Sequence, residues 1–194
     1  MTARDSGLLL NFPITKNGRQ NCRNFWAMEK KFDYIQAKEL ARVFHKYKVK
    51  YMFIGKSGAI ILGYPDTTQD IDVYPLKSKE NCLGLVNALL ALDFPLSAKE
   101  QREILRGKDF IQLRKGPFDI DLVFAPDGIE NFDKAYSRSH KIEGLMVADL
   151  DDIIRSKEKA GRLKDKESLE RLREFRSWFL KNKNKFACIK NRKK

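Results

Sequence analysis

Two short apolar segments that each carry a pair of aspartates place the strongest limit on how this chain folds. They are QDIDVY at positions 69–74 and FDIDLVF at positions 118–124. In both, charged and apolar residues alternate, which predicts β-strands because successive side chains of a strand point to opposite faces. Asp70 and Asp72 therefore project from one face of their strand, while the apolar residues beside them enter a core.

Asp119 and Asp121 repeat this arrangement in the second segment. If the two strands are neighbours, up to four carboxylates meet on one face, which is enough to hold two magnesium ions. Carboxylates so close together repel one another unless a cation lies between them. A single Asp-x-Asp motif is weak evidence, whereas two of them in apolar segments favour a metal-binding or catalytic site. Charges that protect an edge strand from aggregation are the alternative interpretation.

A glycine turn follows an earlier apolar strand, at Ile54-Gly55-Lys56-Ser57. The end of this stretch is similar to a phosphate-binding P-loop, but that motif needs a glycine at position 50, where the chain has lysine. What remains is a strand, a sharp turn and the start of a helix, an arrangement that suits the phosphates of a nucleoside triphosphate. An exposed helix start is the competing interpretation for Lys56.

Hydrophobic periodicity predicts the other elements. We expect strands over residues 50–54, 69–74, 110–113 and 118–124, a short helix ending near residue 63, and helices over 32–47, 77–92, 130–138, 150–160 and 166–180. This order indicates an α/β (α+β) fold with a small mixed sheet flanked by helices and a helical C-terminal part.

Three regions are expected along the chain. They are a flexible N-terminal extension over 1–30, an α/β core over 31–148, and a basic helical segment over 149–194 packed on that core. Residues 1–30 show no clear periodicity, and Met28 shortly precedes the first patterned segment, so a start assigned upstream in error is the other explanation. The tail over 181–194 is expected to fray.

Composition narrows the classes of ligand and partner. Three cysteines and two histidines are too few and too scattered for a zinc or disulfide framework, so a bound metal needs oxygen ligands, which favours Mg²⁺ or Mn²⁺. No apolar run reaches the roughly 18–20 residues of a membrane span, so a cytoplasmic protein without membrane contact is expected. The net charge is +13, and residues 151–194 hold sixteen Lys and Arg against seven Asp and Glu. This basic end favours RNA as a partner, although a solvated lysine-rich helix gives the same composition.

Together, these motifs resemble the polymerase-beta-like nucleotidyltransferase superfamily. Its pattern is a hydrophobic residue and glycine, then an Asp-x-Asp, then a third aspartate on a later strand; the matching residues here are Ile54-Gly55, Asp70 with Asp72, and Asp121. Three further stretches are similar to small nucleotidyltransferase-like proteins that include abortive-infection and minimal-nucleotidyltransferase toxins: Gly63 to Asp72, Ser156-Lys157, and Gly161 to Asp165. The chain departs from the pattern at Lys56, where the family has a small residue, and at Asp66, where it often has arginine.

The resemblance implies a Mg²⁺-dependent enzyme that transfers an NMP from an NTP to a nucleic acid or protein acceptor. Asp70, Asp72 and Asp121 would then be the catalytic and metal-binding residues. The residues implied to bind the nucleotide are Gly55, Lys56, Ser57, Lys157 and Arg162. The implied partners are a tRNA or other RNA and an antitoxin protein, in a toxin–antitoxin or phage-defence system.

Two other functions are compatible with the sequence. The first is a catalytically silent module that keeps the fold and binds RNA or a partner protein. The second is a sugar-nucleotide transferase, which also uses an Asp-x-Asp, although such folds usually need a longer chain. For Lys157 and Arg162, a solvated helix end followed by a helix cap at Asp165 is the structural alternative.

Overall fold

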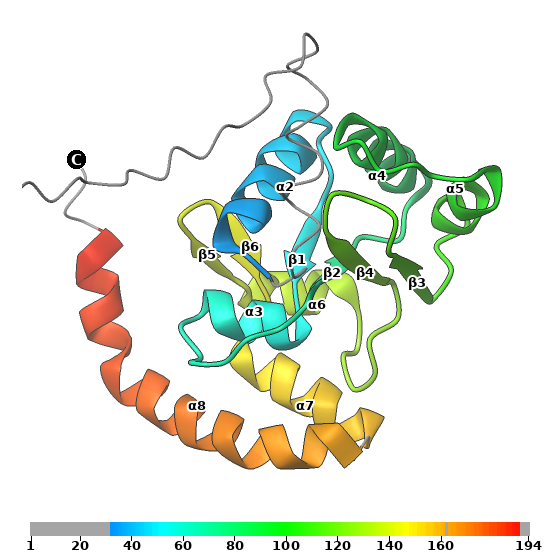
Figure 1. The fold of residues 1–194 in the computed structure, drawn as a ribbon. Coiled ribbons are helices and arrows are strands. Elements are labelled where there is room, and N and C mark those ends of the chain that lie inside the picture. The colour runs from blue at the N-terminus through cyan, green and yellow to red at the C-terminus, as the bar shows by residue number, and fades with distance from the viewer. Residues whose placement is uncertain (1–31, 162, 191–194) are drawn as a thin grey trace, which may run out of the picture.

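A computed structural model describes residues 32–161 and 163–190 of the chain. The expected N-terminal extension (1–30) and Arg162 lie outside these residues. The described part confirms a mixed α/β (α+β) fold, in which helices surround a six-stranded mixed sheet (Figure 1). None of its helices combines the length and the apolar character needed to cross a membrane.

The sheet and its helices follow the predicted order closely. The strands are β1 (Tyr51–Phe53), β2 (Asp70–Pro75), β3 (Phe110–Leu113), β4 (Asp119–Val123), β5 (His140–Ile142) and β6 (Leu145–Val147). The helices are α2 (Tyr34–Lys46), α3 (Gly55–Ile61), α4 (Lys79–Ala91), α5 (Ala98–Leu105), α6 (Phe132–Arg138), α7 (Leu150–Ala160) and α8 (Leu163–Lys190).

The two acidic strands are direct neighbours in the sheet, whose order is β3-β4-β2-β1-β6-β5. β2 and β4 run parallel, with Asp70 opposite Asp119 and Asp72 opposite Asp121. Side chains at paired positions of adjacent strands share a face. The register therefore places both Asp-x-Asp pairs side by side on one face of the sheet.

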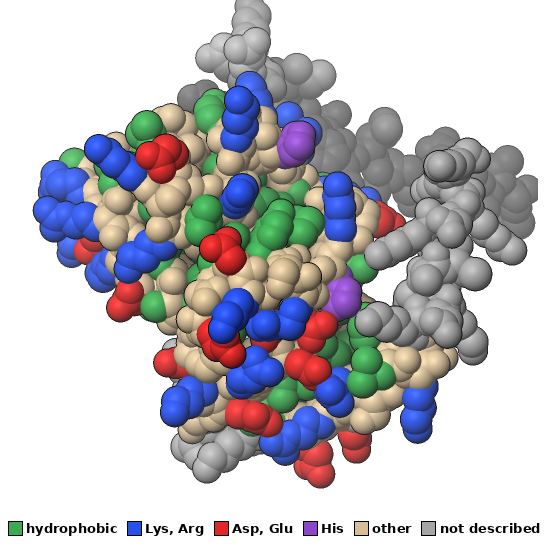
Figure 2. Space-filling model, turned by 180° about the vertical axis from the view of Figure 1, so that it is seen from behind, with side chains coloured by type: hydrophobic (Ala, Val, Ile, Leu, Met, Phe, Trp, Pro, Cys, Tyr) green, Lys and Arg blue, Asp and Glu red, His purple; other side chains and the backbone are tan. Residues whose placement is uncertain are grey.

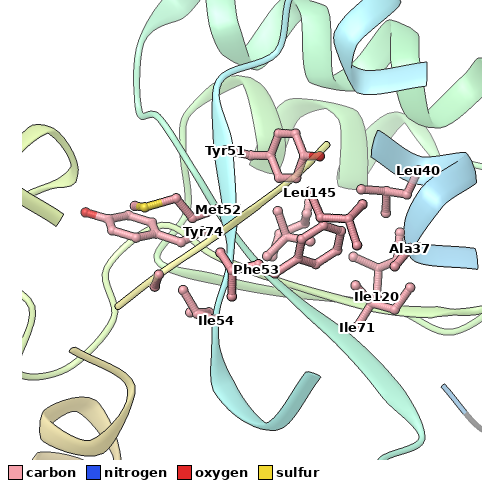
Figure 3. Close-up of a cluster of buried hydrophobic side chains, with 14 of the residues drawn as sticks. Ala37, Leu40, Tyr51, Met52, Phe53, Ile54, Ile71, Tyr74, Ile120 and Leu145 are labelled. Carbon is pink, nitrogen blue, oxygen red and sulfur yellow. The ribbon is translucent and has the colours of Figure 1, made fainter. Parts of the chain in front are cut away.

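The opposite face of the sheet forms the main core. Phe53, Ile71 and Ile120 are almost fully buried there, together with Ala37 and Leu40 of α2, as Figure 3 shows. Removing this apolar surface from water holds α2 against the sheet. This side of the sheet contributes packing, and the aspartates lie on the other face.

The acidic face is covered only in part. Met52, Ile54 and Tyr74 point to it in Figure 3, and the Tyr74 ring lies 5.2 Å from that of Phe132 in α6. The helix α3 contacts β2 on one side and α7 on the other, and α7 in turn packs against α8. The C-terminal helices therefore lie against the core near the acidic strands, as Figure 1 shows for α3, α7 and α8.

Two features of the fold were not predicted. Helix α5 begins with a capping box, in which Ser97 accepts from the N–H of Glu100 and the Glu100 carboxylate accepts from the N–H of Ser97. The hairpin β5–β6 turns at Glu143 and Gly144, both with positive φ. Each element is too short for a clear periodicity, although the Ser-x-x-Glu signal was present in the sequence.

The last helix differs from the expectation at both ends. It begins at Leu163, three residues before the predicted start, and it continues to Lys190 rather than ending at residue 180. Asp165 therefore lies inside α8 and is not its N-cap, so that structural alternative is wrong in detail. The preceding helix α7 ends as predicted, with Gly161 in the left-handed conformation (φ 62°).

Candidate metal and nucleotide site

Three carboxylates gather where β2 and β4 pair. Asp70 is one-third exposed, Asp72 is partly buried, and Asp121 is buried with its side chain 9% exposed. Thr68 donates its hydroxyl to Asp70 Oδ1 at 3.0 Å, which fixes the direction of that carboxylate. The structure thus brings together the three aspartates that the sequence singled out, and it places Asp119 beside Asp70 in the same register.

Asp72 is the most perturbed of the three. Loss of water raises its pKa to about 7, and the negative charges of Asp70 and Asp121 act in the same direction. The positive charge of Lys157 and a hydrogen bond that the backbone N–H of Ser57 donates to the Asp72 carboxylate offset part of this effect. Burial likewise raises the pKa of Asp121, against the opposing charge of Arg114. The charged forms of Asp72 and Asp121 are therefore disfavoured in the structure as it stands.

Arg114 is the cation closest to this cluster, and the sequence analysis missed it. Its Nη2 lies 2.5 Å from Asp121 Oδ1 and 3.5 Å from Asp70 Oδ2, while its Nη1 donates to the carbonyl of Ile120 at 3.3 Å. The register of the structure explains its position: in the hairpin β3–β4, Gln112 pairs with Asp121, so Arg114, two residues on, faces the same side.

The glycine turn packs directly against Asp72. Gly55 begins α3 with φ of +59°, and a Cβ built on it would lie 2.3 Å from Asp72 Oδ2. Only glycine fits, because this φ is unfavourable for other residues and the carboxylate occupies the space of a side chain. The glycine of the motif thus brings the backbone next to the carboxylate cluster.

Ser57 acts within the protein in this conformation. Its side chain is fully buried, donates to the Ile54 carbonyl at 3.2 Å and accepts from the Asp72 N–H at 2.9 Å. It therefore joins the glycine turn to β2 and positions Asp72. Ser57 was expected to bind the nucleotide, but its buried hydroxyl is not accessible to a phosphate in this conformation.

Lys56 and Asp66, the two departures from the family pattern, contact each other. Lys56 Nζ lies 3.3 Å from Asp66 Oδ2, and Arg171 of α8 approaches the same oxygen at 4.0 Å. Although burial alone would raise it, the pKa of Asp66 is lowered by the Thr67 N–H, Lys56 and Arg171. Each departure thus supplies the other with a partner, and the pair ties the glycine turn to the loop before β2.

Lys157 reaches the site from α7. It is partly buried, and its charge acts on Asp72, so the structure brings it to the carboxylate cluster as the sequence analysis expected. Arg162 lies outside the described residues. Of the five residues expected to bind nucleotide, Gly55, Lys56, Ser57 and Lys157 therefore surround Asp72 or the turn beside it.

The residues present fit a divalent cation in chemistry, because carboxylate oxygens are the ligands that Mg²⁺ and Mn²⁺ prefer and their charge is incompletely neutralised. Within residues 32–161 and 163–190, however, no group of three or more His, Cys, Asp or Glu side chains is arranged to hold a metal as it stands. Arg114 contacts two of the three aspartates, and its guanidinium takes up space that a shared ion would need.

Comparison with known proteins adds no family assignment. No protein-family model matches the chain, and no curated protein is similar to it.

Proposed function

We propose that the protein is a Mg²⁺-dependent nucleotidyltransferase that moves an NMP from an NTP to a nucleic acid or protein acceptor. The observation that carries this proposal is the in-register parallel pairing of Asp70–Asp72 with Asp119–Asp121. Purely structural charges gain nothing from being concentrated in this way, because like charges on adjacent strands destabilise a sheet. Binding of a metal ion and a triphosphate would explain why the carboxylates are concentrated there.

In this proposal Asp70, Asp72 and Asp121 hold Mg²⁺. The ion, when bound, neutralises triphosphate charge and lowers the pKa of the acceptor hydroxyl. The acceptor oxygen attacks the α-phosphorus in line, a new P–O bond forms, and the bond to the β-phosphate breaks to release pyrophosphate. Asp121 would help to remove the hydroxyl proton.

The remaining residues bind and orient the nucleotide. The backbone of Gly55 lies beside Asp72, and the ammonium of the next residue, Lys56, pairs with Asp66. Phosphates bound to a metal ion that Asp72 holds would rest against this turn. Lys157 supplies a second positive charge from α7, which would stabilise charge that develops on the phosphates. The hydroxyl of Ser57 accepts a hydrogen bond from the backbone N–H of Asp72 and so fixes the position of Asp72.

The proposal is tested by incubating the full chain with Mg²⁺, total tRNA or cell lysate, and each NTP labelled at the α-phosphate. We expect label on an RNA or protein acceptor with the wild type, and none with Asp70→Ala/Asp72→Ala. Asp109→Asn is the matched control, because Asp109 is an exposed carboxylate that pairs with Lys77.

Label transfer that survives the double substitution would show that the carboxylates are not catalytic. No transfer with any of the four NTPs and either acceptor pool would favour the silent RNA-binding or protein-binding module.

A further inference from the structure

Arg114 occupies a specific place beside the acidic face. It directly follows Leu113, the last residue of β3, at a position whose side chain shares the face of Asp121. Its guanidinium bridges Asp121 and Asp70, two carboxylates from two different strands. A cation that touches both strands reduces the repulsion which their in-register pairing creates.

The position of Arg114 allows its guanidinium to leave the carboxylates. Its side chain is 36% exposed, so a path to solvent is open, and it lies just beyond the hydrogen-bonded pairs of the hairpin. By contrast, the aspartates that it contacts lie on β2 and β4, two interior strands of the sheet. The guanidinium can therefore move away while the carboxylates stay in place.

We propose that Arg114 is an internal counter-ion, which holds Asp70 and Asp121 in the metal-free protein and has to withdraw when a divalent cation binds between these carboxylates. This inference rests on the proposed metal site and adds that metal binding has to break the Arg114 contacts. The guanidinium and the ion compete for the same oxygens, so the apparent affinity for metal is the intrinsic affinity lowered by the Arg114 contacts.

The competition predicts that loss of Arg114 has opposite effects on the stability of the metal-free protein and on its affinity for metal. Without metal, loss of Arg114 leaves less positive charge to balance the three neighbouring carboxylates, so the protein becomes less stable. With metal, the same loss removes the competitor, so binding becomes tighter. A residue that merely supports the fold would lower stability without increasing the affinity for metal.

The test is Mn²⁺ binding to the full chain, measured by calorimetry and by electron paramagnetic resonance, with thermal unfolding in EDTA and in excess Mg²⁺. For Arg114→Met we expect a Kd for Mn²⁺ about tenfold lower than that of the wild type, since one charge-assisted contact is lost from the competing state. Its melting temperature should fall in EDTA and recover in Mg²⁺. The Kd and the melting temperature of Arg114→Lys, which keeps the charge, should lie between those of the wild type and of Arg114→Met. This variant replaces Arg114→Met in the test if Arg114→Met does not fold without metal.

Lys108→Met is the matched control, because Lys108 is a half-exposed cation that pairs with Glu103 and not with the acidic face. It should leave both the Kd and the effect of Mg²⁺ unchanged. Equal or weaker Mn²⁺ binding by both Arg114 variants would overturn the inference while leaving the metal site intact. Normal Mn²⁺ binding without NMP transfer would overturn the proposed enzyme and leave the role of Arg114, whereas no Mn²⁺ binding by any variant would overturn both.

Discussion

At the scale of single residues, Asp72 shows how the site is balanced between folding and function. Its carboxylate is held away from water beside two other carboxylates, which favours its neutral form in the absence of metal. A residue selected for stability alone would not be acidic here. The arrangement becomes favourable only when a cation is supplied.

The first prediction concerns the pH dependence of stability. The pKa of Asp72 is about 7 in the folded protein and about 4 in an unfolded chain, so between these values the folded state binds more protons. The contribution of this carboxyl is therefore fully present below pH 4 and is lost as the pH rises through 7. In urea unfolding with EDTA from pH 5 to 8.5, we expect Asp72→Asn to lack this decline and to be more stable than the wild type at pH 8.

Asp109→Asn, which removes an exposed carboxylate far less constrained than Asp72, should keep the wild-type decline. The same slope in the wild type and in Asp72→Asn would show that Asp72 does not titrate in this range.

The second prediction concerns the glycine turn. Gly55→Ala introduces a side chain at positive φ and places it against the Asp72 carboxylate. Gly144→Ala also introduces one at positive φ (91°), but nothing lies within 4 Å of its Cβ. Both should lose about 1–2 kcal/mol of unfolding free energy from backbone strain. Only Gly55→Ala should lose more than this and also lose Mn²⁺ binding, as measured by urea unfolding and calorimetry. Equal effects of the two substitutions would contradict the close approach of Gly55 to Asp72.

The site could be predicted from the sequence only in part, and the reasons lie in particular residues. Asp70, Asp72 and Asp121 stand out because a charge in an apolar strand is unusual in the sequence itself. Arg114 does not, because its role depends on the pairing of β3 with β4, and a basic residue near a turn is common. The buried hydroxyl of Ser57 was misjudged for the same reason: burial is a property of the packed structure.

At the scale of elements, α7 is anchored through its first turn. Asp152 is fully buried, accepts from Arg138 Nε and Nη2 at 3.1 and 2.9 Å, and also accepts from Arg155 Nη1 at 2.9 Å. Arg138 is the last residue of α6, so this contact fixes α7 to the preceding helix. The same helix carries Lys157 to the carboxylate cluster.

The third prediction follows from this anchor. Arg138→Ala removes a bidentate partner from a buried carboxylate and should cost about 2 kcal/mol of unfolding free energy, since Arg155 still compensates part of the charge. Arg173→Ala removes the partner of Glu158 in an exposed ion pair between α8 and α7, and should cost about 0.5 kcal/mol or less. Guanidinium unfolding of both variants measures the difference. An Arg138 effect no larger than that of Arg173 would show that Asp152 does not need its partner on α6.

Long, periodic elements were the ones that the sequence predicted well. The boundaries of α7 were predicted without error, because an aspartate cap precedes its apolar face and a left-handed glycine follows it. The short hairpin β5–β6 was missed, since three-residue strands carry no measurable alternation. They are strands because β6 pairs with β1 and β5 pairs with β6. Tertiary contacts, rather than local preference, define such elements.

At the scale of the whole molecule, charge is the dominant property. The net charge is +13, yet Figure 2 shows Lys and Arg side chains interspersed with Asp and Glu on the face that it presents. The excess in residues 151–194 makes the C-terminal part the first region to test for contact with a polyanion.

The fourth prediction is salt-dependent RNA binding through exposed basic residues of α8. Neutralising Arg171, Arg173 and Lys181 together with glutamine should weaken binding to tRNA and reduce its dependence on salt, because fewer counterions are released. Neutralising the exposed Arg102, Arg106 and Lys108 near α5 is the charge-matched control. Fluorescence anisotropy between 50 and 200 mM KCl measures both, and an equal loss in the two triple variants would assign the effect to overall charge rather than to α8.

The register between β2 and β4 also sets the time at which the site comes into existence. Asp70 and Asp119 are partners although forty-nine positions separate them along the chain. Closing so long a loop is slow compared with forming a local helix or hairpin. During synthesis, the carboxylates cannot meet until the ribosome has released the whole of β4. Metal binding would therefore report that β4 has joined the sheet, and each bound ion would stabilise the pairing of β2 with β4.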